Sequence, residues 1–326
     1  MKMDKKEKAL SLKANLIAVF ILISSFLYAD VLIKGKVVNG KTKEALAFVN
    51  IGILNKNIGT VSDIDGTFQL KLEDQYNEDS LVFSMIGYTR ESYQIIDFKR
   101  FFKNENAIEI NLEARNYEIK EVIISDQLNW KTKIIGNETT STSSFTSFKG
   151  DNLGAELGLR MKVKKHAKTY LEEFYFSIAY NSYDSLWFRL NIYSIKDDLP
   201  DKNLVPENII VKTKIKNGVV TVDLRKYFIT VEDDFIAALE RLRDPYSIYT
   251  DTTSITISSE ISFTLGKRKD ENGKRVEEER LSKTPVLEFS STFLKSAYIR
   301  KASHGFIVKE TFARPGFWMK VSYKKY

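Results

Sequence analysis

A period of two in the apolar residues, repeated along most of the chain after residue 30, constrains the fold more than any other feature. In a β-strand successive side chains point to opposite faces of the sheet, so each alternating run predicts a short strand with one buried face. Representative runs are Val31, Ile33 and Val37, and then Ile108, Ile110 and Leu112. Asn39-Gly40 and Asp65-Gly66 lie between such runs and supply the positive φ of tight turns. The sequence therefore predicts an all-β protein.

Residues 31–112 hold about seven such strands and no helical period, which predicts a small antiparallel sandwich. We expect Gly66 at positive φ in a hairpin turn between strands that end near Ser62 and begin near Phe68. Asp63-x-Asp65-Gly66 is also similar to the opening of a calcium loop. We prefer the turn, with the Asp side chains capping backbone amides, because a strand follows at once.

Three segments of this region carry a family resemblance. They are Gly35–Val38 with Lys41–Ile51, then Gly59–Phe68, and then Ser80–Tyr88. Together they resemble the carboxypeptidase regulatory-like domain over about residues 31–115. The resemblance implies a prealbumin-like seven-stranded sandwich of exported envelope proteins, including the leading segment of TonB-dependent outer-membrane receptors, and it implies no peptidase activity. Ile119–Ile124 is similar to the continuation in such receptors, but only about 200 residues remain, too few for the rest of one.

The N-terminus has the layout of a secretory signal peptide. The apolar run Leu16–Leu27 is too short to span a bilayer and precedes the small residue Ala29. The lysines before it are Lys2, Lys5, Lys6, Lys8 and Lys13. We therefore expect residues 1–29 to be removed on export, and no transmembrane helix in the mature chain. An uncleaved anchor and a buried core helix are the alternatives, and the lysines argue against the second.

Composition excludes several classes of chemistry. The chain has no cysteine, so disulfides, thiolate metal sites, thiol nucleophiles and cysteine-linked lipid are all impossible. The net charge of +7 falls to about +4 once the lysine-rich residues 1–29 are removed. So mild a balance does not indicate nucleic acid as a partner. The destination that we expect is the periplasm, the outer membrane or the cell surface.

We expect a linker over residues 126–150, because Thr139–Ser144 is six hydroxyl residues in succession. The first domain is then 30–125, and residues 151–326 form a second, jelly-roll-like β-sandwich. Phe188–Tyr193, Val220–Leu224 and Asp234–Glu240 resemble an uncharacterised jelly-roll-type module of exported proteins. Asp233–Arg243 fits a short helix, although its apolar residues fit a strand equally well. Residues 266–283 predict an exposed hairpin.

Residues that could carry chemistry are few. His166 and His304 lie far apart and lack the spacing of zinc ligands, so we interpret both as packing or surface residues. Glu232-Asp233-Asp234, next to Glu240, could serve a glycosidase or hold calcium, but acids are also common in solvated turns. We therefore predict no catalytic residues, no metal site and no cofactor.

Tyrosine and tryptophan gather early in the second domain and could stack on a sugar or anchor a protein. Tyr180, Tyr183 and Trp187 are the candidates for such a platform. The leading hypothesis is an exported, non-catalytic binding or adhesion-type envelope protein whose partner is a glycan or another envelope protein. The alternative is a carbohydrate-active hydrolase that uses acids of the second domain, such as Asp223, Glu232 or Asp234.

Overall fold

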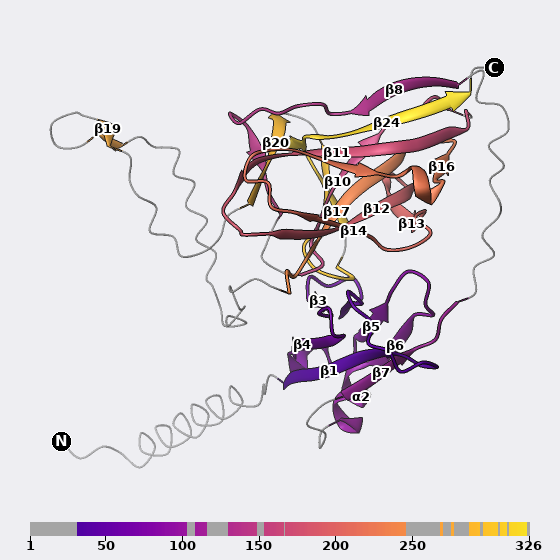
Figure 1. The fold of residues 1–326 in the computed structure, drawn as a ribbon. Helices are drawn as coiled ribbons and strands as arrows, with labels where there is room; N and C mark the ends of the chain where they lie inside the picture. The colour runs from indigo at the N-terminus through magenta and orange to yellow at the C-terminus, as the bar shows by residue number, and fades with distance from the viewer. Residues whose placement is uncertain are drawn as a thin grey trace, which may run out of the picture.

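The first module, residues 31–115, consists of two small sheets that pack face to face (Figure 1). The first sheet has the order β4-β1-β7, with β1 at Val31–Asn39, β4 at Thr67–Leu72 and β7 at Ile108–Leu112. The second has the order β3-β2-β5-β6, with β2 at Asn50–Ile53, β3 at Gly59–Val61, β5 at Ser80–Ser84 and β6 at Glu91–Gln94. The seven predicted strands are confirmed. One pair differs from the antiparallel expectation, because β7 runs parallel to β1.

The structure is a computed structural model that describes residues 31–102, 108–115, 130–148, 153–165, 167–245, 268–269, 275–276, 287–293, 296–305, 307–311 and 313–324. The predicted signal peptide, Ile119–Ile124 and His166 lie outside these residues. No helix among the described residues is long and apolar enough to cross a membrane.

The alternating residues of the first module meet between its two sheets and form a core of their own. Val37, Phe68, Phe83 and Ile110 are all 3% exposed or less. Every buried member of this core falls between residues 33 and 112. The first module therefore buries an apolar core that needs no side chain of the second.

A short helix, α2 (Ile95–Phe101), is the element that the period of two missed. It buries Ile95 and Phe98 and leaves its other side chains half-buried or exposed. Phe98 packs against Tyr93 and Phe102, with ring centroids 5.4 and 4.7 Å away. Two buried positions in seven residues are too few to show a helical period, which is why the prediction of no helix here was wrong.

Gly66 has a φ of 79°, as predicted, but its turn is not a hairpin. The turn joins β3 to β4, and these strands belong to different sheets. Asp65 stabilises it: Oδ1 accepts hydrogen bonds from Oγ1 of Thr67 at 2.6 Å and from its backbone amide at 3.0 Å, which lowers the pKa of Asp65. These contacts are those of the turn interpretation, with an Asp side chain capping an amide.

Gly66→Val is expected to destabilise the first module by about 1–3 kcal/mol. The left-handed backbone disfavours a branched side chain, and a Cβ would lie 2.6 Å from the carbonyl oxygen of Val37. Thermal unfolding followed by circular dichroism measures the effect. Ile64→Val changes an exposed residue of the same turn and serves as the control. An unchanged melting temperature for Gly66→Val would contradict this account of the turn.

The second module, residues 130–324, consists of two curled antiparallel sheets that form a sandwich (Figure 1). One sheet has the order β13-β12-β17-β10-β21-β22, with β14 also paired to β12. Its strands are β10 (Glu156–Met161), β12 (Leu186–Lys196), β13 (Leu199–Asn203), β14 (Ile209–Thr213), β17 (Phe235–Leu242), β21 (Ala297–Arg300) and β22 (Ile307–Glu310). We call it the junction sheet, because its outer face contacts the first module.

The opposite sheet has the order β23-β20-β11-β24-β8, with β15 and β16 also paired to β11 and β9 paired to β20. Its strands are β8 (Trp130–Gly136), β9 (Phe145–Thr146), β11 (Thr169–Asn181), β15 (Gly218–Asp223), β16 (Thr230–Val231), β20 (Leu287–Phe293), β23 (Ala313–Pro315) and β24 (Phe317–Lys324). β18 (Arg268–Lys269) pairs with β19 (Arg275–Val276), as the predicted hairpin requires. Short one-turn helices lie at Asp74–Tyr76 and Arg225–Tyr227.

One prediction about this module was wrong, and one that was left open between a helix and a strand is decided for the strand. Part of the predicted linker belongs to the opposite sheet, because β8 pairs with β24 and β9 pairs with β20. Within the hydroxyl-rich run, Ser144 is buried and shares a hydrogen bond with Oγ of Ser291 at 2.7 Å. Asp233–Arg243 contains strand β17 and no helix. The neighbouring strands β10 and β12 supply the hydrogen bonds that favour the strand.

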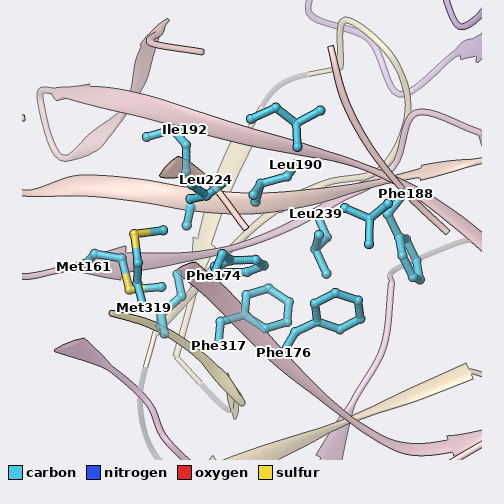
Figure 2. Packing of buried hydrophobic residues seen from close by; sticks show 14 of the residues in the cluster. Met161, Phe174, Phe176, Phe188, Leu190, Ile192, Leu224, Leu239, Phe317 and Met319 are labelled. Carbon is cyan, nitrogen blue, oxygen red and sulfur yellow. The ribbon is translucent and has the colours of Figure 1, made fainter. Parts of the chain in front are cut away.

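The core of the second module lies between its two sheets and is rich in phenylalanine (Figure 2). Phe176 of the opposite sheet meets Phe188 of the junction sheet edge to face, with ring centroids 5.6 Å apart. Phe289 and Phe317 pack in the same way at 5.6 Å. Such edge-to-face contacts stabilise beyond the area that they bury, so this cluster holds the two sheets together.

A fragment of residues 30–126 is expected to fold alone, because the core of the first module is complete without the second. It should show β-type circular dichroism and a cooperative thermal transition. Separation uncovers Phe48 and Val61, so we also expect the fragment to bind a hydrophobic dye that the whole chain does not bind. A fragment that is unfolded at neutral pH would contradict the prediction.

Candidate functional site: a buried charge row at the junction of the two modules

The two modules meet through an apolar contact on the outer face of the junction sheet. Phe48 and Val61 of the first module pack with Leu153, Trp187 and Leu242 of the second, and all five are buried. The rings of Phe48 and Trp187 have centroids 5.8 Å apart. At the border of this contact, Nη1 of Arg243 lies 3.0 Å from Oδ2 of Asp63.

Beside this contact, four charged residues form a line across four neighbouring strands. Arg189 on β12 stands opposite Glu240 on β17, Glu240 opposite Glu156 on β10, and Glu156 opposite Arg300 on β21. We call these four residues the charge row. Glu240 is 0% exposed, Arg189 1% and Glu156 4%. Two carboxylates that face each other directly repel, so the row requires the arginine at each end.

The ion pairs follow this order. Nη1 of Arg189 lies 3.4 Å from Oε2 of Glu240, and Nη1 of Arg300 lies 3.3 Å from Oε2 of Glu156. Asn191 connects the two carboxylates, because its Nδ2 donates to Oε1 of Glu156 at 2.6 Å and to Oε2 of Glu240 at 3.1 Å. The row is therefore a single network of compensated charges, with two carboxylates and two guanidinium groups.

The first module completes the network with polar groups of its own. The Asn50 amide, with its nitrogen toward Glu240, donates to Oε1 of that residue at 2.5 Å, and its oxygen accepts from Nη1 of Arg189 at 3.0 Å. Nη2 of Arg189 donates to the carbonyl oxygen of Phe48. Phe48 has a φ of 61°, which is rare for an aromatic residue and indicates a backbone held by its surroundings.

Burial and the neighbouring charges shift the pKa values of these groups. Burial raises the pKa of Glu240, although the charge of Arg189 acts in the opposite direction. Burial and the nearby Glu156 raise the pKa of Tyr193, whose hydroxyl donates to Oε1 of Glu156 at 2.7 Å. Burial is the largest single influence on the pKa of Arg300 and would lower it, but Glu156, Tyr193 and Glu240 together outweigh burial and the pKa is raised.

The loop after β21 forms the second contact between the modules. His304 lies there with a φ of 58°, and its Nε2 donates to the carbonyl oxygen of Asn50 at 3.2 Å. Oγ of Ser84 lies 3.3 Å from the same nitrogen, and the carbonyl oxygen of His304 accepts from the Asn55 amide at 2.9 Å. Burial lowers the pKa of His304 to about 4. Of the packing and surface roles that the sequence left open for His304, the contacts show packing.

Two glycines of the first module allow this close approach. A Cβ at Gly52 would lie 2.2 Å from the carbonyl oxygen of Ser303, and one at Gly59 would lie 2.5 Å from it. Both are backbone contacts, so the loop would have to shift to admit any larger residue. The junction thus requires residues without a side chain at Gly52 and Gly59, where the first module contacts the loop at 301–305.

The predicted aromatic platform is not assembled. Tyr180 is 51% exposed, whereas Trp187 is 5% exposed and lies in the contact between the modules. Tyr183 is half-buried, and its hydroxyl accepts from Nη2 of Arg241 at 2.7 Å. Lys212 lies over the ring of Trp187, 3.7 Å from its centroid. Trp187 therefore contributes to the junction and not to an exposed surface.

Two of the three candidate acids, Asp223 and Asp234, are hydrogen-bonded to arginine. Nε of Arg225 donates to Oδ1 of Asp223 at 2.8 Å, and this hydrogen bond lowers the pKa of Asp223. Nε of Arg160 donates to Oδ2 of Asp234 at 3.0 Å, while Oδ1 of Asp234 accepts from the amide of Val163 at 3.1 Å. Glu232 and Asp233 are exposed. No group of three or more His, Cys, Asp or Glu that could hold a metal occurs in the part of the chain that the structure describes.

The sequence did not reveal the charge row. Arg189 and Asn191 alternate with Phe188, Leu190 and Ile192, so they looked like the solvent face of a half-buried strand. Both faces of β12 are in fact buried over most of its length. A charged residue opposite a charged residue can be seen only once the strand register is known, and the register is a tertiary property.

The comparison with protein families identifies a known domain in the region of the first module. Residues 33–124 match the CarboxypepD_reg-like domain. This match covers the seven strands of the first module except the first two residues of β1, and it ends before the second module begins. The search of curated proteins finds no protein similar to the chain.

Proposed function

We propose that the chain is an exported, non-catalytic binding or adhesion-type envelope protein whose partner is a glycan or another envelope protein. In this proposal the two modules act as one rigid body and present a single surface to the partner. The junction is the observation that carries this proposal. It combines an apolar contact with the charge row, and breaking it would expose Phe48, Val61 and Trp187 to water and remove the hydrogen bonds that Asn50 and the Phe48 carbonyl make to Glu240 and Arg189. Such a junction favours a fixed orientation over two loosely linked modules.

The CarboxypepD_reg-like domain supports the same proposal, because such domains are often non-catalytic β domains that accompany another module. An export signal at residues 1–29 would deliver the protein to the periplasm or the outer surface of the cell. Two rigidly joined sandwiches lose little conformational freedom on binding, which favours affinity.

The acids favour binding over hydrolysis. A glycosidase needs one carboxylic acid with a raised pKa to protonate the leaving group. The pKa of Asp223 is lowered instead, and Asp234 is held by Arg160 and by a backbone amide. Glu240 has a raised pKa, but it is 0% exposed between the junction sheet and the first module. These contacts suit structural roles for all three residues.

The proposal is tested with residues 30–326 on a glycan array and against extracted envelope proteins, with every hit confirmed by calorimetry on the purified pair. We expect a saturable partner and no turnover of a polysaccharide panel. Turnover that Asp223→Ala, Glu232→Ala or Asp234→Ala abolishes would replace the proposal with the hydrolase. Finding neither a partner nor turnover would also count against it.

A further inference from the structure

Exposed lysines of the second module gather at the edge of the opposite sheet where β8 lies. β8 is the last strand of this sheet, and Lys131 and Lys133 are exposed on it. Lys131 pairs with Tyr323 of β24, and Tyr323 in turn pairs with Thr169 of β11. Lys168 is exposed and precedes Thr169, so strand pairing brings it to the same end of the sheet. Lys324, the last described residue of β24, is exposed there too.

The loop that connects β10 to β11 adds three more exposed lysines, at Lys162, Lys164 and Lys165. Its backbone is held by hydrogen bonds. The Val163 amide donates to Asp234, the Ala167 amide to the carbonyl of Lys164 at 3.2 Å, and the Thr169 hydroxyl to the carbonyl of Ala167 at 2.9 Å. The described residues on either side of position 166 therefore present their ammonium groups from a hydrogen-bonded backbone, which reduces the ordering that binding would require.

We call these seven residues the lysine surface. Its members are Lys131, Lys133, Lys162, Lys164, Lys165, Lys168 and Lys324. Lys309 pairs with Asp198 and Lys320 with Glu172. Over the described ranges, no carboxylate forms an ion pair with any of the seven. Asp234 accepts a hydrogen bond from the Val163 amide, so the neighbouring exposed acids Glu232 and Asp233 lie near the start of the loop between β10 and β11. Two exposed acids do not balance seven lysines, so the lysine surface keeps a net positive charge.

We propose that the lysine surface binds an acidic polysaccharide, with carboxylate or sulfate groups repeated along the polymer as the recognised chemistry. This inference rests on the proposed binding function and names its partner class. Lysine is a compact charge on a flexible stem, so seven of them suit a run of anions better than a single planar group. Spread over three segments, they also match an extended polymer, and their combined field speeds its association.

The surroundings favour a polymer over a lipid bilayer. Ile134 is the exposed large apolar side chain of β8, at 41%, while Val163 is half-buried and Val321 is buried. A segment that lies in the membrane interface needs an apolar face with several aromatic or leucine side chains to insert. Within β8 the lysine surface offers one exposed large apolar side chain, Ile134, beside the half-buried Trp130, so its charges outnumber the side chains that could insert.

The test uses residues 30–326 and polyuronate chains as the probe, with neutral dextran beside them. The variant carries Lys131→Gln, Lys133→Gln, Lys164→Gln and Lys165→Gln, which keeps four polar side chains and removes four charges. We expect the dissociation constant for polyuronate to rise by about tenfold or more at low salt. We also expect the dependence of affinity on salt to become shallower, because fewer counterions are released.

The matched control removes the same charge elsewhere, at the exposed residues Lys34, Lys36, Lys196 and Lys202. At physiological ionic strength, where the Debye length is about 8 Å, it should change polyuronate affinity by less than about twofold, since charges farther away than this are screened. Thermal unfolding checks that both variants fold, and two double variants, one in β8 and one in the loop, replace the quadruple variant if it does not.

Each outcome separates the inference from the function on which it rests. Polyuronate binding that the lysine variant leaves unchanged would overturn the inference alone. Binding to vesicles of phosphatidylglycerol but not to polyuronate would overturn the choice of a polysaccharide. Binding only to a neutral glycan or to an envelope protein would also overturn the inference while supporting the proposed function.

Discussion

Arg189→Met is expected to lower the free energy of unfolding by about 3–5 kcal/mol, because it leaves a carboxylate buried without its cation. Glu240 is 0% exposed and takes its only arginine contact within the described residues from Arg189. Glu156, directly opposite on β10, repels the same carboxylate. Methionine fills most of the volume of arginine, so the loss reports charge compensation more than a cavity. Urea unfolding, followed by circular dichroism, measures it.

The double variant Arg189→Met/Glu240→Leu is the control. Replacing both members of a buried ion pair by apolar residues of similar size is often neutral, so we expect it to recover most of the lost stability. Recovery will be partial, because Asn191 and Asn50 lose an acceptor on Glu240. A double variant as unstable as Arg189→Met would show that arginine acts through packing, and a stable Arg189→Met would contradict the charge row altogether.

Acidification is expected to weaken the junction through His304. The pKa of His304 is about 4 in the folded protein, against about 6.5 for an unperturbed histidine. Between these values the unfolded state binds a proton that the folded state does not, so stability falls as the pH drops from about 6.5 to about 4. The shift corresponds to roughly 3 kcal/mol, and the loss is complete below pH 4. Burial is its main cause, and the charges of Arg300 and Arg90 add to it.

His304→Asn isolates this effect. Asparagine tolerates the left-handed backbone of this position and carries no titrating group. Glu240 acts in the opposite direction, because its raised pKa favours the folded state as the pH falls, but that contribution is common to both proteins. Melting temperatures between pH 7 and pH 4 should therefore fall more steeply for the wild type than for His304→Asn. Parallel curves would show that His304 does not carry the pH dependence.

Much of the fold was predictable from local pattern. Alternation at β1, β4 and β7 predicted half-buried strands, and these strands alternate between exposed and buried positions as expected. Asp65-Gly66 predicted a turn with positive φ, and Gly66 has it. Such features depend on a few consecutive residues, so the sequence contains all the information they need.

Where the outcome depended on distant partners, local pattern gave a wrong prediction or left two alternatives open. The hydroxyl-rich segment at 139–144 looked too polar to fold, but strands β8 and β9 on either side of it pair with β24 and β20. Residues 235–242 fitted a helix or a strand, and pairing with β10 and β12 decided for the strand. In each case the deciding hydrogen bonds come from residues far along the chain, which local propensity does not include.

The candidate site at the junction likewise depends on distant residues and could not be predicted from local pattern. Trp187, Arg189 and Asn191 occupy alternate positions of β12. Local pattern is compatible with these side chains facing solvent, where Trp187 could belong to an exposed aromatic platform. The first module covers this face instead, so Trp187 packs against Phe48 and Arg189 reaches the backbone of the same residue.

The sequence by itself determined the all-β class, the seven strands of the first module, the turn at Gly66 and the resemblance to the regulatory-like domain, since each is written in neighbouring residues. Tertiary structure alone decided which strands are buried on both faces, which charged residues lie opposite one another, and where lysines without an ion-pair partner among the described residues lie close together. Strand register and the contact between modules set these properties. A charge such as that of Glu240 acquires its role only when folding removes it from water and places Arg189 beside it.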